Sequence, residues 1–140
     1  MKVQVILGEQ LEQINLNQVI NNQNQPVSFN KLVNPSLFFK IPFIPGSLDL
    51  AIVAATQGMS KADHNTKLFF RKVGSTNILA DTGNLPIPAA LIQEGEGVNL
   101  NVEFKKIIIR EEGEYEAVVS IDDEEFSQTI FIKGIEKLTA

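Results

Sequence analysis

Residues 102–117 read VEFKKIIIREEGEYEA and carry the strongest fold signal in this chain. Apolar Val102 and Phe104 belong to a run that alternates with polar residues, which is the period of a half-buried β-strand. A Glu-Glu-Gly connection follows, and Tyr115 then begins a second alternating run. The stretch therefore predicts a strand, a turn in which Gly113 is free to adopt a positive φ, and a second strand.

The same stretch resembles the corner between strands E and F of immunoglobulin-like domains, whose pattern is L-x-I-x-x-V-x-x-x-D-x-G-x-Y-x-C. Glu111 replaces the usual aspartate, and Ala117 stands where the family has a cysteine. The resemblance implies that the Tyr115 hydroxyl bonds backbone a few residues upstream, so that Gly113 and Tyr115 form a structural corner between two sheets. The alternative is an ordinary strand after an ordinary turn. The matching residues are Val102, Phe104, Ile107, Glu111, Gly113 and Tyr115.

The chain departs from the family by having neither cysteine nor tryptophan. An inter-sheet disulfide and a tryptophan plug are therefore absent, which argues against antibody-type or receptor-type domains. Where the disulfide would sit, we expect Ala117 to face Ile52 or Ala54 of the opposite sheet.

Alternating apolar patterns and turn residues along the chain predict an all-β, antiparallel, immunoglobulin-like β-sandwich of about seven to nine strands. At 140 residues it forms one domain, residues 1–140. The run at 47–57 is the most apolar and predicts a buried central strand, although a buried helix fits the same short run. Strands are expected at residues 2–7, 27–34, 47–57, 67–73, 77–81, 98–109, 115–121 and 126–133.

Residues 10–34 are rich in asparagine and glutamine and predict a polar N-terminal connection. Within it we expect a short helical turn near Leu11 and Ile14 and an exposed loop at 21–26. Asparagine is a weak helix former, which limits any helix to a single turn.

Residues 35–45, PSLFFKIPFIP, predict an edge strand or an extended crossing, because Pro42 cannot donate to a central ladder. Lys40 also suits an edge. One face of a strand cannot hide Phe38, Phe39 and Phe43 together, so at least one is expected to be exposed. Phe38, Lys40 and Phe43 are therefore the candidate protein interface, and the alternative is that all three phenylalanines are buried.

Charge is uneven along the chain, at +2 over residues 1–93 and −7 over residues 94–140. The acidic part argues against nucleic-acid binding, which needs clustered lysine and arginine. No apolar stretch reaches the roughly 18 residues of a membrane span, so we expect no membrane partner and a cytoplasmic location. The binding partner is expected to be another protein or a second copy of the chain.

No residues are assigned to catalysis, a cofactor or a metal. The only histidine, His64, is expected to be solvated in a loop at 58–66; Ser60 and Asp63 stand near it in sequence, but a triad requires groups assembled in space. The acidic turn at 122–125 is expected to be exposed and metal-free, with calcium as the alternative because Ca²⁺ takes oxygen ligands.

The chain as a whole is similar to uncharacterised bacterial and phage β-sandwich proteins. Our first hypothesis is a non-enzymatic protein-interaction module. The alternative is a structural component, such as a decoration or tail-associated domain, of a phage or other bacterial assembly. An enzyme is disfavoured because no catalytic set emerges from the residues.

Overall fold

The computed structural model describes residues 1–20, 23–93, 95 and 97–137, with side chains except those of residues 14–29 and 136–137. Eleven strands lie in this part of the chain, more than the seven to nine predicted. None of its helical segments has the length and apolarity to cross a membrane. The elements are β1 (Lys2–Gly8), β2 (Gln10–Ile20), β3 (Gln23–Val33), β4 (Phe38–Ile44), β5 (Gly46–Gln57), β6 (His64–Lys72), β7 (Ile78–Asp81), β8 (Leu85–Ile87), the 3-10 turn η1 (Ala89–Leu91), β9 (Asn99–Ile109), β10 (Gly113–Ile121) and β11 (Glu124–Lys137).

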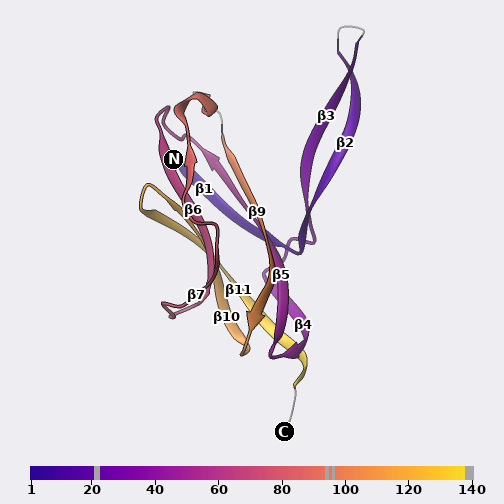
Figure 1. The fold of residues 1–140 in the computed structure, drawn as a ribbon, viewed down its shortest axis with the longest axis vertical. Coiled ribbons are helices and arrows are strands. Elements are labelled where there is room, and N and C mark those ends of the chain that lie inside the picture. The colour runs from indigo at the N-terminus through magenta and orange to yellow at the C-terminus, as the bar shows by residue number, and fades with distance from the viewer. Residues whose placement is uncertain (21–22, 94, 96, 138–140) are drawn as a thin grey trace.

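The fold is all-β, and most strands belong to two sheets in a sandwich-like arrangement (Figure 1). The smaller sheet has the order β1-β5-β9, and the larger has the order β4-β11-β10-β6-β7 with β8 also paired to β6. The pairs within these sheets are antiparallel except β4 with β11, which is parallel. That parallel pair differs from the wholly antiparallel sandwich predicted.

The core forms between the two sheets. β5 is the central strand of its sheet, as predicted, and a helix at 47–57 is excluded. Ile52 and Ala54 of β5 belong to the same fully buried cluster as Ala117 of β10, which lies in the other sheet. All three are apolar side chains of the buried core, and no disulfide links the two sheets because the chain has no cysteine.

The tyrosine corner has the predicted geometry. Tyr115 is 2% exposed, and its hydroxyl donates a 2.6 Å hydrogen bond to the carbonyl oxygen of Glu111. Gly113 has a φ of +144°, which other residues rarely adopt. The Tyr115 ring stacks on Phe70 with centroids 5.7 Å apart. Burial raises the pKa of the phenol, because the phenolate would lose its hydration.

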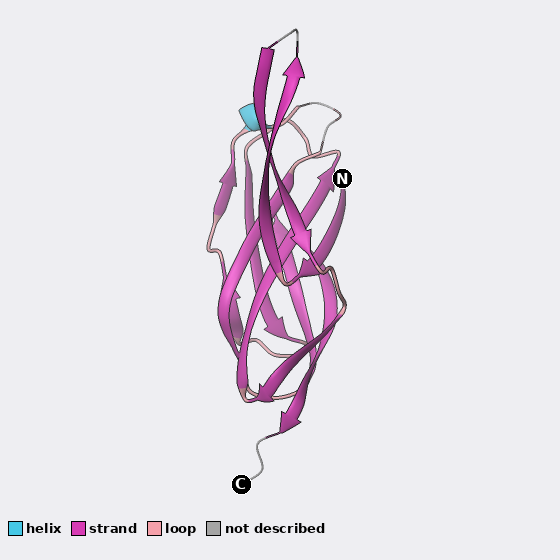
Figure 2. Ribbon diagram, turned by 90° about the vertical axis from the view of Figure 1, so that its right-hand side faces the viewer, coloured by secondary structure: helices cyan, strands magenta, loops and turns pink. Residues whose placement is uncertain are grey.

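Residues 10–34 form a hairpin, not the connection predicted. β2 and β3 pair from Gln10 opposite Val33 to Ile20 opposite Gln23 without a register shift, and the pair extends away from the two sheets (Figures 1 and 2). The helical turn near Leu11 was wrong, because that residue lies in β2. The loop predicted at 21–26 was wrong for residues 23–26, which lie in β3, and residues 21–22 lie outside the described residues. Cross-strand pairing over the whole length outweighs the weak strand propensity of asparagine.

Two further boundaries differ from the prediction. β8 lies between the strands expected at 77–81 and 98–109, where no strand was predicted, and the Thr66 hydroxyl holds it by donating to the Leu85 carbonyl at 2.6 Å. β11 continues past Gly134, which was expected to end it. A Cβ on Gly134 would lie 2.6 Å from Ile44, so this glycine allows the close approach of β4.

Candidate functional site

β4 is the outer strand of the larger sheet, as the sequence predicted. Its free edge is blunted. The Ser36 hydroxyl accepts the Phe38 N–H at 3.0 Å and donates to the Phe38 carbonyl at 2.7 Å, and Pro42 has no N–H. Because these devices leave few backbone groups for an added strand, any contact here falls to side chains.

The side chains on this edge form an exposed aromatic pair. Phe38 of β4 lies opposite Phe131 of β11, and their rings stack with centroids 5.8 Å apart and planes 5° apart. The two residues are 45% and 38% exposed. An aromatic pair that is already ordered loses little conformational entropy when a partner covers it.

Two lysines border the aromatic pair. Lys40 lies opposite Lys133, and the Lys40 ammonium stands 5.9 Å from the centroid of the Phe38 ring. Both lysines are exposed, and neither makes an ion pair with a side chain that the structure describes. Together with Ile135, which is 67% exposed, they line a hollow of about 340 Å³. We call Phe38, Lys40, Phe131, Lys133 and Ile135 the Phe38–Phe131 face.

The five residues of this face include two lysines and no acid, in a chain whose net charge is −5, and Glu114 of β10 lies opposite Phe131 on the neighbouring strand. A neighbouring cleft of about 850 Å³, which Phe38 and Lys40 also line, runs beside it to the base of the β2–β3 hairpin. Glu9 and Asp49 line that cleft as well, so Lys40 is accompanied there by two carboxylates.

The three candidate interface residues are not all brought together. Phe38 and Lys40 lie on the Phe38–Phe131 face. Phe43 is 45% exposed, but it shares the alternation of Phe39 and Ile41, which are buried. The expectation that at least one phenylalanine is exposed is confirmed, and the alternative of complete burial is wrong. The sequence did not identify Phe131 or Lys133, because the pairing of β4 with β11 spans most of the chain.

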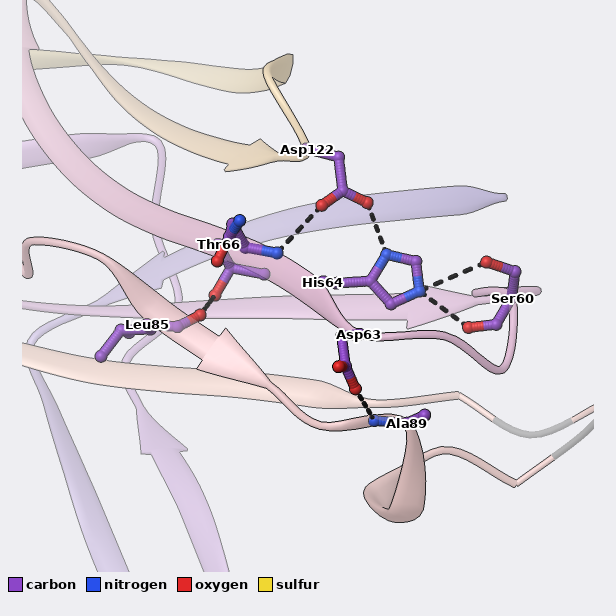
Figure 3. Close-up of polar contacts among 8 residues, drawn as sticks. Ser60, Asp63, His64, Thr66, Leu85, Ala89 and Asp122 are labelled. Carbon is purple, nitrogen blue, oxygen red and sulfur yellow. Dashed lines mark hydrogen bonds and ion pairs between the residues drawn. The ribbon is translucent and has the colours of Figure 1, made fainter.

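His64 departs most from the prediction. It is the first residue of β6 and is 8% exposed, not solvated in a loop. Its Nδ1 lies 2.5 Å from the Asp122 carboxylate, and its Nε2 lies 2.7 Å from the Ser60 carbonyl oxygen and 3.3 Å from the Ser60 hydroxyl (Figure 3). Asp63 is not a partner of the histidine; its carboxylate accepts the Ala89 N–H at 2.9 Å.

Ser60, His64 and Asp122 resemble a catalytic triad in composition but not in hydrogen bonding. A carbonyl and a carboxylate can only accept, so this geometry suits a ring in which both nitrogens donate, the imidazolium form that His64 has below its folded-state pKa. A triad base must accept the serine proton at Nε2, and here that nitrogen is committed to the carbonyl. The hydrogen bonds to Ser60 and then to Asp122 raise the pKa of His64 above its ordinary value.

Asp122 is the partner of His64 that the sequence analysis missed, because the two residues are 58 positions apart. It also accepts the Asn65 N–H at 2.9 Å, which together with His64 lowers its pKa. Asp122 and Asp123 both have positive φ, at 49° and 68°, as a two-residue type I′ turn requires. The cluster therefore ties the β10–β11 turn to the start of β6 and to the preceding loop.

The acidic residues 122–125 are all exposed, as predicted. Within the described residues, no group of three histidine, aspartate or glutamate side chains is arranged to hold a metal ion. Asp122 is already engaged by His64 and Asn65, so this turn does not converge its carboxylates on one point.

No protein-family model matches the chain, and no curated protein is similar to it in sequence.

Proposed function

We propose that this protein is a non-enzymatic interaction module that binds another protein through the Phe38–Phe131 face. The observation that carries the proposal is the ordered aromatic pair left exposed at a sheet edge. Aromatic side chains are enriched in the contacts that dominate binding energy. The blunted backbone of β4 supports recognition by side chains over strand addition.

The charge of the face defines the chemistry of the partner. Lys40 and Lys133 lie opposite each other on β4 and β11, beside the aromatic pair. The complementary surface is therefore one that carries carboxylates around an apolar or aromatic anchor. Such a segment is also repelled by the other acidic parts of residues 94–140, which carry a net charge of −7.

An unbiased displayed peptide library tests the proposal without a known partner. Selection on the wild-type protein is expected to enrich peptides with an aromatic or large aliphatic residue flanked by Asp or Glu. Binding of these peptides should fall at least tenfold in Phe131→Ser and in Lys133→Glu. The matched control is Leu91→Ser, which removes another exposed apolar side chain away from the face and should bind normally. Enrichment of basic peptides, or equal binding by all variants, would contradict the proposal.

We propose that the sandwich is immunoglobulin-like, and the Tyr115 bond to Glu111 supports this reading of the corner. The second candidate function is a structural component of a phage or other bacterial assembly. The projecting β2–β3 hairpin favours it, because such an arm can reach a neighbouring subunit.

A further inference from the structure

The β2–β3 hairpin is a two-stranded sheet in which each strand pairs only with the other in the described part of the chain. Figures 1 and 2 show it standing clear of the two sheets. Its base is fixed: Glu9 N–H donates to the Val33 carbonyl at 2.9 Å, and Leu11 N–H donates to the Glu103 carboxylate. A two-stranded hairpin without further packing is marginally stable in water, so the outer part of this arm gains from a partner.

The two edges of the arm differ in protection. Exposed strand edges are usually blunted by lysine, proline or a bulge. β3 contains Pro26 and Lys31, whereas β2 contains no proline or lysine and pairs with β3 without a bulge. Residues 13–20 of β2 carry no charge at all. The chain blunts β4, whereas residues 14–20 of β2 form an edge without lysine, proline or charge.

The absence of charge indicates which strand can pair with this edge. In an antiparallel pairing about a two-fold axis, each residue near the axis lies close to its own copy. Like charges placed directly opposite destabilise a sheet, and residues 13–30 contain none. An uncharged strand also offers nothing to attract a strongly acidic or basic partner.

Pairing through the arm also avoids electrostatic repulsion between the acidic parts of two copies of the chain. Residues 94–140 carry a charge of −7, so close contact between two sandwiches is unfavourable. Pairing through a projecting arm joins two chains away from these acidic parts.

We propose that the outer edge of β2 pairs with β2 of a second copy, antiparallel and centred within residues 14–20. The product is a two-fold dimer with a continuous four-stranded sheet in the order β3-β2-β2-β3. This self-association is separate from the Phe38–Phe131 face, and neither proposal depends on the other.

Light scattering coupled to size exclusion tests the proposal, with an expected mass for the wild type of twice 15.5 kDa. Asn15→Lys with Asn17→Lys should give the monomer mass, because paired β2 strands lie about 5 Å apart and bring the four lysines together. Asn24→Lys with Ser28→Lys adds the same charge to β3 as the matched control. Those strands would be about 14 Å apart in the dimer, beyond the Debye length of about 8 Å at physiological salt, so this variant should remain dimeric. Near-ultraviolet circular dichroism of Tyr115 shows that each variant is folded.

Disulfide formation gives a second, positional test, because the chain has no cysteine of its own. Single cysteines introduced in turn at positions 14–20 should cross-link at one or two adjacent positions near the two-fold axis, where the Cα atoms lie within the roughly 4.4–6.8 Å of a disulfide. Gln25→Cys in β3 should not cross-link. A monomeric wild type, a dimer that survives the β2 lysines, or equal cross-linking from β2 and β3 would overturn the proposal. Phe131→Ser should leave the dimer intact, which separates this result from failure of the proposed function.

Discussion

Removing the Tyr115 hydroxyl tests the corner directly. Tyr115→Phe deletes one oxygen and keeps the ring, so the stack on Phe70 and the packing of the core are retained. The change therefore isolates the 2.6 Å hydrogen bond to the Glu111 carbonyl. Its effect on stability measures how strongly this bond joins the connection at 110–112 to β10.

The structure sets the expected size of the effect. A typical hydrogen bond contributes about 0.5–1.5 kcal/mol net, and a buried acceptor left without a partner costs about 1–3 kcal/mol. The Glu111 side chain is 67% exposed in a surface connection, so water can reach the region of the carbonyl once the hydroxyl is gone. We therefore expect a loss of about 1 kcal/mol in the free energy of unfolding. For a domain of this size that corresponds to a fall in Tm of about 3–5 °C.

Urea unfolding followed by far-ultraviolet circular dichroism is the suitable assay, because the variant lacks the only tyrosine and the chain has no tryptophan. The midpoint should fall while the slope stays unchanged, since the same surface is exposed on unfolding. Thr129→Val is the control: it removes a hydroxyl from an exposed position of β11 and should change stability by less than about 0.5 kcal/mol. A Tyr115→Phe variant as stable as the wild type would refute the reasoning that the hydroxyl pins the corner.

The other predictions concern the histidine cluster and the acidic turn. The raised pKa of His64 means that its contribution to stability is complete below about pH 6.5 and is lost as pH rises through the folded-state pKa. The lowered pKa of Asp122 means that its contribution is present above about pH 3.9 and is lost as pH falls through its folded-state pKa. The stability difference between wild type and His64→Gln, measured by urea unfolding, should therefore be largest between about pH 4 and 6.5, and a difference that stays constant from pH 5 to 9 would contradict this. Thermal melts in millimolar calcium and in chelator should coincide, because Asp122 is already committed to His64 and Asn65; a rise of several degrees with calcium would favour the calcium alternative.

The alternation of apolar and polar residues along the sequence predicted those strands whose burial follows from that alternation. The strand at 98–109 and the turn into Tyr115 were placed correctly because one face of each strand is apolar and packs on the core, where that face is buried in β10 and partly buried in most of β9. The position of β4 at an edge followed from Pro42, whose missing N–H excludes a central strand. These predictions rest on covalent geometry and on the period of two, both of which the sequence displays directly.

The parts that were missed depend on contacts between distant segments. His64 is buried because Asp122 and Ser60 satisfy both ring nitrogens, and nothing near His64 in sequence reports the aspartate. β8 forms because Thr66 holds the Leu85 carbonyl against β6. The arm at 10–33 was missed because asparagine and glutamine have weak preferences, whereas the register of eleven cross-strand pairs is a property of both strands together.

Dimerisation through β2 would change how the Phe38–Phe131 face binds. One face offers a stacked aromatic pair and two solvated lysines without a deep pocket, so a single contact is expected to be weak. A dimer carries two such faces, and the second contact is then intramolecular, with an effective concentration that can raise the overall affinity by about 10²–10⁴. Partners that display the same acidic segment repeatedly would gain this affinity, whereas partners with a single copy of the segment would not. A dimer with two such weak faces would therefore bind a repetitive surface more tightly than a single soluble protein.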